Sequence, residues 1–464
     1  MPVINEPNQP TTSASLEIVI IGGEAAGMSA AAKARRVDRN ATITVYEQSD
    51  VISFGACGLP YYIGDFFSDA GEMSEFSPEQ FASRKIDVQT RHQVTRINTT
   101  EQVVHVHNLA TGKYFERPYD RLLIATGAEP VIPPVPGLKE GLNSGRVFCV
   151  KTMKDGSYLK EAITNPGIRD VTIIGAGYIG LEMAEALERQ GKRVCLIESA
   201  PHPLATTFDR EVAQWVMDTL DKKGIQSHWQ ESAKSLSEDK YHRLLLTTDK
   251  GQHQTDLIVL CTGVCPNTRF VSNIGLETMD NGAIVTDNQG RTNLPNIFSA
   301  GDCATVIHGQ LKKPVWIPLA TYANKMGRIV GEVMTGLDKH FPGAYGAACV
   351  KVLSLEAGRV GLSEREAQKN GINYQTVVIK DKDHSNYYPD PSDILVKLIY
   401  EAASKKLLGG QIAGKRGAVL RVDALIAAIK GGLTTEDLGM MDFCYAPPFA
   451  RTWDALNIAG NVAK

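Results

Sequence analysis

One cysteine in this chain, Cys57, has surroundings suited to redox chemistry. It lies in the run SFGACGLPYY at residues 53–62, and no second cysteine follows within the next turns of chain. A solitary thiol does redox chemistry through a mixed disulfide or a sulfenic acid. Pro60 favours a helix that begins just after the cysteine, so we expect the positive helix end to lower the pKa of the thiol. The alternative is a buried, inert thiol.

A glycine-rich turn near the N-terminus predicts a dinucleotide site. The turn GGEAAG, residues 22–27, follows a β-branched strand and precedes an alanine-rich helix, and Glu47 closes the next strand. In such a unit the helix N-terminus faces a pyrophosphate and the acid takes a ribose hydroxyl, so Gly22, Gly27 and Glu47 are candidate ligands. Glu24 replaces the middle glycine of the pattern, which leaves a purely structural turn as the alternative.

The same unit recurs later in the chain with all of its glycines. The second turn contains Gly175, Gly177 and Gly180, and its next strand ends at Glu198. Two such units argue for two dinucleotides, held in separate domains so that their redox ends can meet. Glu198 would hydrogen-bond a ribose diol and repel a 2'-phosphate, so we expect NADH to be preferred to NADPH.

Three shorter segments support this pairing. Strand-to-loop passages ending in Thr-Gly follow the two units, the first of them at Thr126 and Gly127 and the second at residues 262–263. A third strand, at residues 296–302, ends in Asp302, which is placed to hydrogen-bond a polar cofactor chain. A turn cap is the alternative for Asp302.

The composition bounds the size and class of the protein. With 464 residues, 43% of them hydrophobic, the chain can form about three domains with cores of their own. A net charge of -3 gives no pull towards nucleic acid or anionic lipid, so the partners are small molecules. Residues 1–14 lack the basic start and apolar core of a signal peptide, and no apolar stretch could cross a bilayer. We expect a disordered tail on a cytoplasmic protein.

The cysteine spacing predicts neither a metal site nor a disulfide framework. The eight cysteines are scattered and include no CxxC pair. Cys261 and Cys265 form a CxxxC, which we interpret as two ordinary small residues.

The pattern predicts an α/β fold of two Rossmann-like domains followed by an α+β domain. After the tail, we place the first nucleotide domain at 15–150 and 284–340, because the Asp302 strand returns to it, and the second at 151–283. The third domain, 341–464, has short apolar strands and an amphipathic helix but no glycine turn.

Together, the two glycine turns, the Gly301-Asp302 strand end and the SFxxCGLPYY run resemble the flavin-dependent pyridine nucleotide-disulfide oxidoreductases. The likeness covers nearly the whole chain after the tail. Cys57 resembles the redox cysteine of the single-cysteine branch, which contains coenzyme A-disulfide reductases, persulfide reductases, NADH oxidases and NADH peroxidases. The resemblance implies FAD on the first domain, NAD on the second and a C-terminal dimerisation domain in a homodimer.

Local details of the resemblance favour one kind of member. Ala25 aligns with a histidine of the oxidases and peroxidases, which speaks against peroxide chemistry. Coenzyme A-disulfide reductases carry two C-terminal tyrosines, matched here by Tyr387 in NYYPD and Tyr445 in YAPP. The resemblance implies that both reach the partner subunit's site, where a phenol could protonate a leaving sulfur. Asp390 stands where the family usually has glycine, and interface or core aromatics are the alternative for the tyrosines.

The resemblance also carries over contacts to coenzyme A. Cationic and hydroxyl side chains at these positions suit a phosphate-rich ligand, although a solvated helix face is the alternative for the charged ones. The implied contacts are Ser29, Lys33, Arg36, Ser53, Lys85 and Asn324.

We therefore predict an FAD-dependent enzyme that uses NADH, or NADPH, to reduce coenzyme A disulfide or related persulfides and polysulfides. The reaction would run through Cys57 and a mixed disulfide, without a metal. One alternative is an NADH oxidase that reduces dioxygen through a Cys57 sulfenic acid. A more distant alternative is a flavin-binding redox sensor.

Overall fold

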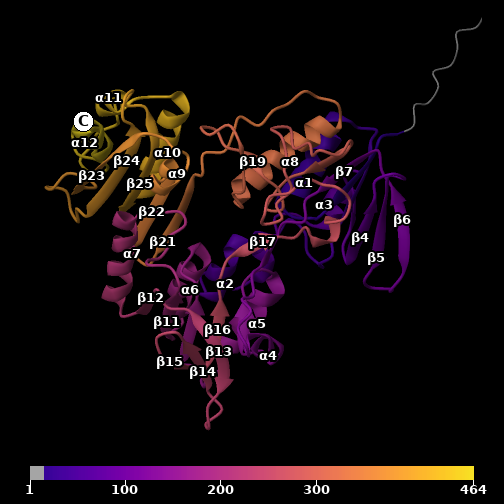
Figure 1. Cartoon of the computed structure of the whole chain (residues 1–464), viewed down its shortest axis with the longest axis horizontal. Coiled ribbons are helices and arrows are strands. Elements are labelled where there is room, and N and C mark those ends of the chain that lie inside the picture. Colours follow the sequence, from indigo (N-terminus) through magenta and orange to yellow (C-terminus); the bar gives the residue numbers. More distant parts are fainter. Residues whose placement is uncertain (1–14, 464) are drawn as a thin grey trace, which may run out of the picture.

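The computed structural model describes residues 15–463 and divides into three bodies (Figure 1). The predicted tail at 1–14 lies outside the described residues. Each body is built around a five-stranded sheet. Two sheets are parallel and the third is antiparallel, which confirms the predicted α/β class with a C-terminal α+β domain.

The first body contains a parallel sheet in the order β18-β7-β1-β2-β3. Its apolar strands are buried on both faces, as expected when helices and a second layer cover a parallel sheet. The second layer is a three-stranded antiparallel sheet that packs on β1 and β7. The strands of the parallel sheet are β1 (Glu17–Ile21), β2 (Thr42–Tyr46), β3 (Asp87–Gln89), β7 (Arg121–Ile124) and β18 (Ile297–Ser299). Those of the second layer are β4 (His92–Asn98), β5 (Val103–Asn108) and β6 (Tyr114–Pro118).

Helices α1 (Ala25–Val37) and α8 (Ala320–Met334) cross closely on the other face of the first sheet (Figure 1). A Cβ atom on Gly327 would lie 2.2 Å from the backbone oxygen of Ala26, so only glycine permits this approach. The crossing joins the N-terminal part of the first body to the segment that returns after residue 284.

The second body contains a parallel sheet in the order β12-β11-β10-β16-β9, which packs against the antiparallel β13–β15. The expected domain boundary at residue 150 falls just after β9, although β9 is a strand of this second sheet. The strands are β9 (Val147–Cys149), β10 (Asp170–Ile174), β11 (Arg193–Glu198), β12 (Gln226–Trp229), β13 (Ala233–Glu238), β14 (Leu244–Thr248), β15 (Gln252–Thr255) and β16 (Leu257–Leu260). The helices are α4 (Leu138–Asn143), α5 (Met153–Thr164), α6 (Tyr178–Arg189) and α7 (Arg210–Lys223).

A two-stranded ribbon connects these two bodies. Strand β8 (Ala128–Pro130) leaves the first body and pairs with the antiparallel β17 (Val264–Pro266), which returns from the second. The chain therefore enters and leaves the second body at the same place. A short hairpin of β19 (Val306–Ile307) and β20 (Pro314–Val315) follows the return.

The third body is an antiparallel sheet in the order β21-β22-β25-β24-β23. Alternate residues of β24 point to opposite faces, so Ile394 and Val396 pack under α10 and α12 while Leu395 packs towards the second body. The strands are β21 (Ala348–Val352), β22 (Leu355–Gly361), β23 (Tyr374–Lys382), β24 (Asp393–Glu401) and β25 (Leu407–Gly414). The helices are α9 (Glu364–Lys369), α10 (Ala418–Gly431), α11 (Thr435–Gly439) and α12 (Ala455–Val462).

Lys397 links the third body to the second through ion pairs. Its side chain is fully buried, and its Nζ pairs with Asp209, Glu211 and Glu364. The first two acids belong to the second body and the last to the third. Within residues 15–463, no helix combines the length and apolar character that crossing a bilayer requires.

Candidate active site

Cys57 lies in a single 3-10 turn, Ala56–Gly58, directly before the short helix α2 (Leu59–Ile63). Leu59 and Ile63 are buried in a core shared with the second body. The segment is also tied to the first glycine turn, because the backbone amide of Phe54 donates to the Glu24 carboxylate at 2.8 Å. The thiol is thus held where the first two bodies meet.

The electrostatics of Cys57 differ from the sequence expectation. Although its side chain is partly exposed, the protein packed around the sulfur desolvates it and raises the pKa of the thiol. The carboxyl groups of Glu182 and Asp302 act in the same direction, and Lys151 opposes them. The prediction that a helix end lowers the pKa of Cys57 is therefore wrong. A five-residue helix has a dipole too small to offset the effect of burial.

The first glycine turn has the shape that a dinucleotide requires. Gly22 has φ of +108°, and a Cβ there would lie 2.2 Å from the backbone oxygen of Ala125. A Cβ on Gly27 would lie 1.9 Å from the oxygen of Gly22, so helix α1 packs directly on the turn. The buried carboxylate of Glu47 accepts the amide of Gly23 at 2.8 Å. These residues fit the predicted FAD.

Glu24 occupies the middle position of this turn. Burial, reinforced by the nearby Glu47 carboxylate, raises the pKa of Glu24 to about 7. The side chain turns towards Phe54 and accepts its amide. Glutamate in place of the usual middle glycine therefore keeps the turn intact and adds a titrating carboxyl group beside it.

The second glycine turn repeats the geometry. Gly175 has φ of +106°, and a Cβ on Gly180 would lie 2.0 Å from the oxygen of Gly175. Apart from its chain neighbours, no described residue has an atom within 4 Å of a Cβ built on Gly177, which leaves open space before helix α6 for a phosphate. The Glu198 carboxylate accepts the amide of Ala176 at 2.7 Å. The fit to a second dinucleotide is as good as the fit to the first.

Neighbouring strands of the first sheet bring Thr126, Gly127 and Asp302 to one edge. Strands β7 and β18 are parallel neighbours, so the residues that follow them lie at the same carboxyl end. Thr126 donates to the oxygen of Asn267 at 2.7 Å, which ties this edge to the returning ribbon. Burial raises the pKa of Asp302, and Lys151 opposes the shift.

The coenzyme A candidates lie on and around helix α1. Ser29 donates to Asn324 of α8 at 2.8 Å, so the structure brings these two together. Lys33 instead pairs with Glu332 of α8 at 2.7 Å. Arg36 and Lys85 are exposed. Ser53 has a left-handed backbone, with φ of +50°, just before the Cys57 turn.

Tyr387 and Tyr445 form a hydrogen-bonded pair on the third body. Their hydroxyl oxygens are 2.8 Å apart, and both side chains are exposed. The remaining hydrogen-bond partners that influence their pKa values, Ser385 and Thr452, also belong to the third body. The hydrogen bond from Tyr387 lowers the pKa of Tyr445, because a donated proton stabilises the phenolate.

Sequence reasoning missed two charged groups near the thiol, Glu182 and Lys151. Burial raises the pKa of Glu182 to about 7, and Tyr61 of α2 donates to its carboxylate at 3.3 Å. The available signal was an acid between two apolar residues that are buried in α6, Leu181 and Met183, close behind the second glycine turn.

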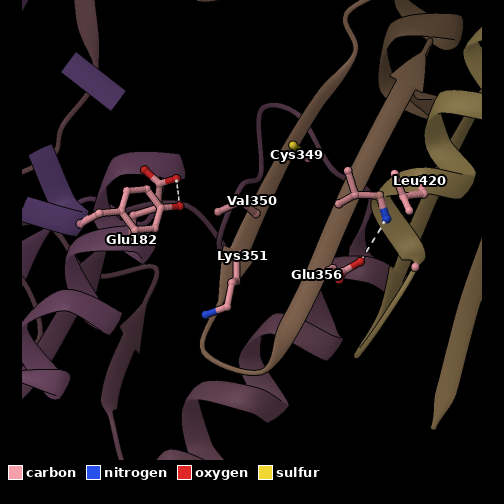
Figure 2. Close-up of a pocket in the computed structure, with 9 residues that line it drawn as sticks. Glu182, Cys349, Val350, Lys351, Glu356 and Leu420 are labelled. Carbon is pink, nitrogen blue, oxygen red and sulfur yellow. Dashed lines mark hydrogen bonds between the residues drawn. The ribbon is translucent and has the colours of Figure 1, made fainter. Parts of the chain in front are cut away.

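Glu182 also borders a cavity of ≈ 390 Å³ between α6 and the third body, shown in Figure 2. Figure 2 shows Cys349 and Lys351 on strand β21 between Glu182 and Glu356. The lining residues are Tyr61, Glu182, Cys349, Val350, Lys351, Glu356, Gly417, Val419 and Leu420.

Comparisons with known proteins place this geometry among redox enzymes. The sequence profile described as pyridine nucleotide-disulphide oxidoreductase matches residues 16–327, and that of the corresponding dimerisation domain matches 347–456. An NAD(P)H coenzyme A polysulfide/persulfide reductase from Pyrococcus horikoshii is 35% identical over 97% of this chain and 98% of its own. A coenzyme A disulfide reductase from Staphylococcus epidermidis is 31% identical over 97% of this chain and 100% of its own. The solved structure of a water-forming NADH oxidase from Lactobacillus brevis is 30% identical, with a TM-score of 0.92 over 97% of this chain and 98% of its own.

Proposed function

Because the chain belongs to the pyridine nucleotide-disulphide oxidoreductases, we propose that it reduces coenzyme A disulfide, or related persulfides and polysulfides, through Cys57. It is an oxidoreductase that uses FAD and NAD(P)H. The main support for a sulfur-containing substrate is the solitary thiol of Cys57 beside the first glycine turn. The reductases among the similar proteins agree with this assignment. All eight cysteines are free thiols, which suits the reducing cytoplasm as the proposed location.

We propose that FAD binds the first body, predicted at residues 15–150 and 284–340, and that the nicotinamide cofactor binds the second body, predicted at 151–283, to which α4 and β9 also belong. When bound, FAD supplies a carrier that accepts a hydride from the nicotinamide and passes an electron pair to sulfur. The chain's own task is placement, since the two glycine turns and Cys57 are held around the junction of the first two bodies. Glu198, already fixed by two backbone amides, supports a preference for NADH over NADPH.

The sulfur chemistry of Cys57 balances as a thiol-disulfide exchange. The Cys57 thiolate attacks one sulfur of the substrate disulfide, forms a mixed disulfide and expels one coenzyme A thiolate. Two electrons, originally from NADH, then cleave the mixed disulfide and release the second thiolate, and two protons convert both products to thiols. One proton comes from NADH oxidation in net terms and the other from solvent. Lys151, the cation that opposes the raised pKa of Cys57, favours the attacking thiolate.

The proposal extends to a homodimer with a shared site. The match to a dimerisation domain supports the dimer. On the third body, large apolar or aromatic side chains are exposed in the single chain, including Tyr387 at 76%, Phe449 at 76% and Met440 at 72%. We propose that Tyr387 and Tyr445 face the partner subunit's Cys57 site, where the phenol of Tyr445, with its lowered pKa, protonates the departing thiolate.

The decisive test compares Cys57→Ser with Cys349→Ser, which removes another exposed thiol. NADH oxidation is followed under nitrogen with coenzyme A disulfide as the only acceptor. We expect Cys57→Ser to lose at least about a thousandfold in rate and Cys349→Ser to retain the native rate. Native-rate turnover by Cys57→Ser would refute the proposal.

The second candidate function is that of an NADH oxidase that reduces dioxygen. The similarity to the water-forming NADH oxidase supports it. The same anaerobic assay separates the two, because a dioxygen-reducing enzyme stops without oxygen. If NADH is consumed only in air, with or without the disulfide, the oxidase function replaces the reductase.

A further inference from the structure

A cluster of three metal-ligating side chains lies in the second body, between its two sheets. Cys195 on β11, His228 on β12 and His253 on β15 offer one sulfur and two ring nitrogen atoms, all within 4.8 Å of one another. These residues take no part in the proposed reaction. They come from three separate strands, so no short spacing in the sequence marked them.

The topology explains why the three side chains meet. In the parallel pair β11–β12, Ile197 lies opposite His228, and Cys195 shares the face of Ile197 because it is two residues earlier on the strand. This face is the one covered by β13–β15, since Ile197 packs with Leu246 of β14. On β15, His253 lies between two exposed glutamines and turns inward to the same gap.

A buried carboxylate stands directly behind the histidines. The Glu231 side chain is only 5% exposed, with one oxygen 2.6 Å from Nε2 of His253 and the other 3.4 Å from Nδ1 of His228. Thr248 also donates to it, at 2.5 Å.

Glu231 thus shares a hydrogen bond with His253 and lies within ion-pair distance of His228. A carboxylate hydrogen-bonded to an imidazole is the outer-shell arrangement typical of metal-binding histidines, because it fixes ring orientation and raises ligand basicity. Thiolate and imidazole together suit Zn²⁺ and similar borderline-soft cations, whereas Ca²⁺ and Mg²⁺ require oxygen ligands. The exposed fractions of the His228 and His253 side chains, 36% and 17%, leave a path from solvent.

We propose that Cys195, His228 and His253 form a binding site for Zn²⁺ or a cation of the same class, with Glu231 as the orienting outer carboxylate. On binding, the Cys195 thiol gives its proton to solvent, the thiolate and two neutral imidazoles coordinate the cation, and water fills the fourth position. The site would brace the two sheets of the second body. The site is also close to Glu198. Cys195 and Glu198 lie on the same strand, β11, and the amide of Glu231 donates to the Glu198 carbonyl at 2.9 Å.

The test titrates the flavin-loaded protein, first stripped with a chelator, with Zn²⁺ in competition with a chromogenic indicator. The measurement uses a Cys57→Ser background so that the reactive thiol does not compete. We expect one tight equivalent per chain, weakened at least about a hundredfold by Cys195→Ser or His253→Gln, and about ten- to a hundredfold by Glu231→Gln. Two matched controls in the same body should leave the affinity unchanged: Cys149→Ser, another partly buried thiol, and His242→Gln, an exposed histidine.

A second measurement needs no variant and so does not depend on the folding of one. Added Co²⁺ should give a tetrahedral d–d absorption, at longer wavelength than oxidised flavin, and a sulfur-to-cobalt charge-transfer band in the difference spectrum. The proposal is overturned if the stripped protein binds no tight equivalent of Zn²⁺. It is also overturned if Cys195→Ser and His253→Gln bind Zn²⁺ as tightly as the parent, or if Co²⁺ gives no charge-transfer band.

Discussion

Replacing Glu24 with glutamine should change how the stability of the first body depends on pH. The protein around Glu24 raises its pKa from 4.5 to about 7, which corresponds to at most about 3 kcal/mol against the charged form. In the unfolded chain the carboxyl group ionises near its ordinary pKa, so folding favours the protonated form. That contribution is fully present below pH 4.5 and is lost as the pH rises through 7. Glutamine keeps the acceptor for the Phe54 amide and cannot ionise.

The assay is urea unfolding of the two proteins at pH 5 and pH 8, followed by FAD release at one fixed concentration of added FAD. We expect the wild-type protein to lose up to about 3 kcal/mol relative to Glu24→Gln between these pH values. Glu140→Gln removes an exposed glutamate of the same charge and should stay within about 0.5 kcal/mol of wild type at both pH values. Parallel pH profiles for wild type and Glu24→Gln would refute the assignment of a buried, titrating carboxyl group at this turn.

Three further substitutions test other parts of the structure. Glu198→Ala should narrow the preference for NADH over NADPH by about tenfold in kcat/KM, since it removes repulsion of a 2'-phosphate worth about 1.4 kcal/mol, and unchanged kinetics with both nucleotides would contradict the role of Glu198. Lys397→Met should destabilise the protein by about 3 kcal/mol in chemical unfolding, because the largely buried Asp209 loses its cation, and wild-type stability would show that the ion pairs contribute little. Tyr445→Phe should lower kcat by about a hundredfold and leave the dimer mass unchanged in sedimentation, whereas Tyr387→Phe should raise the pKa that governs the alkaline limb of the rate profile; a native profile in both variants would contradict a proton-donating pair.

The sequence predicted the parts of the fold that depend on local backbone constraints. The two glycine turns were found because Gly22 and Gly175 require positive φ, which leaves a pattern in neighbouring residues. The strand that ends before Asp302 was placed in the first domain, where β18 pairs with β7. Strand β9 was assigned to the wrong side of a boundary, because three residues carry too little pattern to reveal which sheet they join.

The sequence could not predict features created by the meeting of distant segments. The pKa of Cys57 is raised first by burial among segments that are distant in the sequence, and then by Glu182 and Asp302, which reach the thiol from helix α6 and from the loop after β18. A local argument from Pro60 and the short helix could not include them. The pairing of Lys33 with Glu332 likewise depends on the crossing of α1 and α8, so the coenzyme A role of Lys33 stays a prediction.

The antiparallel ribbon of β8 and β17 makes the second body an insertion whose two ends meet. The surrounding fold is completed by the crossing of α1 and α8, which does not depend on what lies between the ribbon strands. The second body can therefore be exchanged as a unit. The chain would be cut at β8 and β17, and the second body replaced by that of a relative with another nucleotide preference. The exchanged module must also preserve the core that it shares with α2 and the acids that pair with Lys397, since these are further points of attachment.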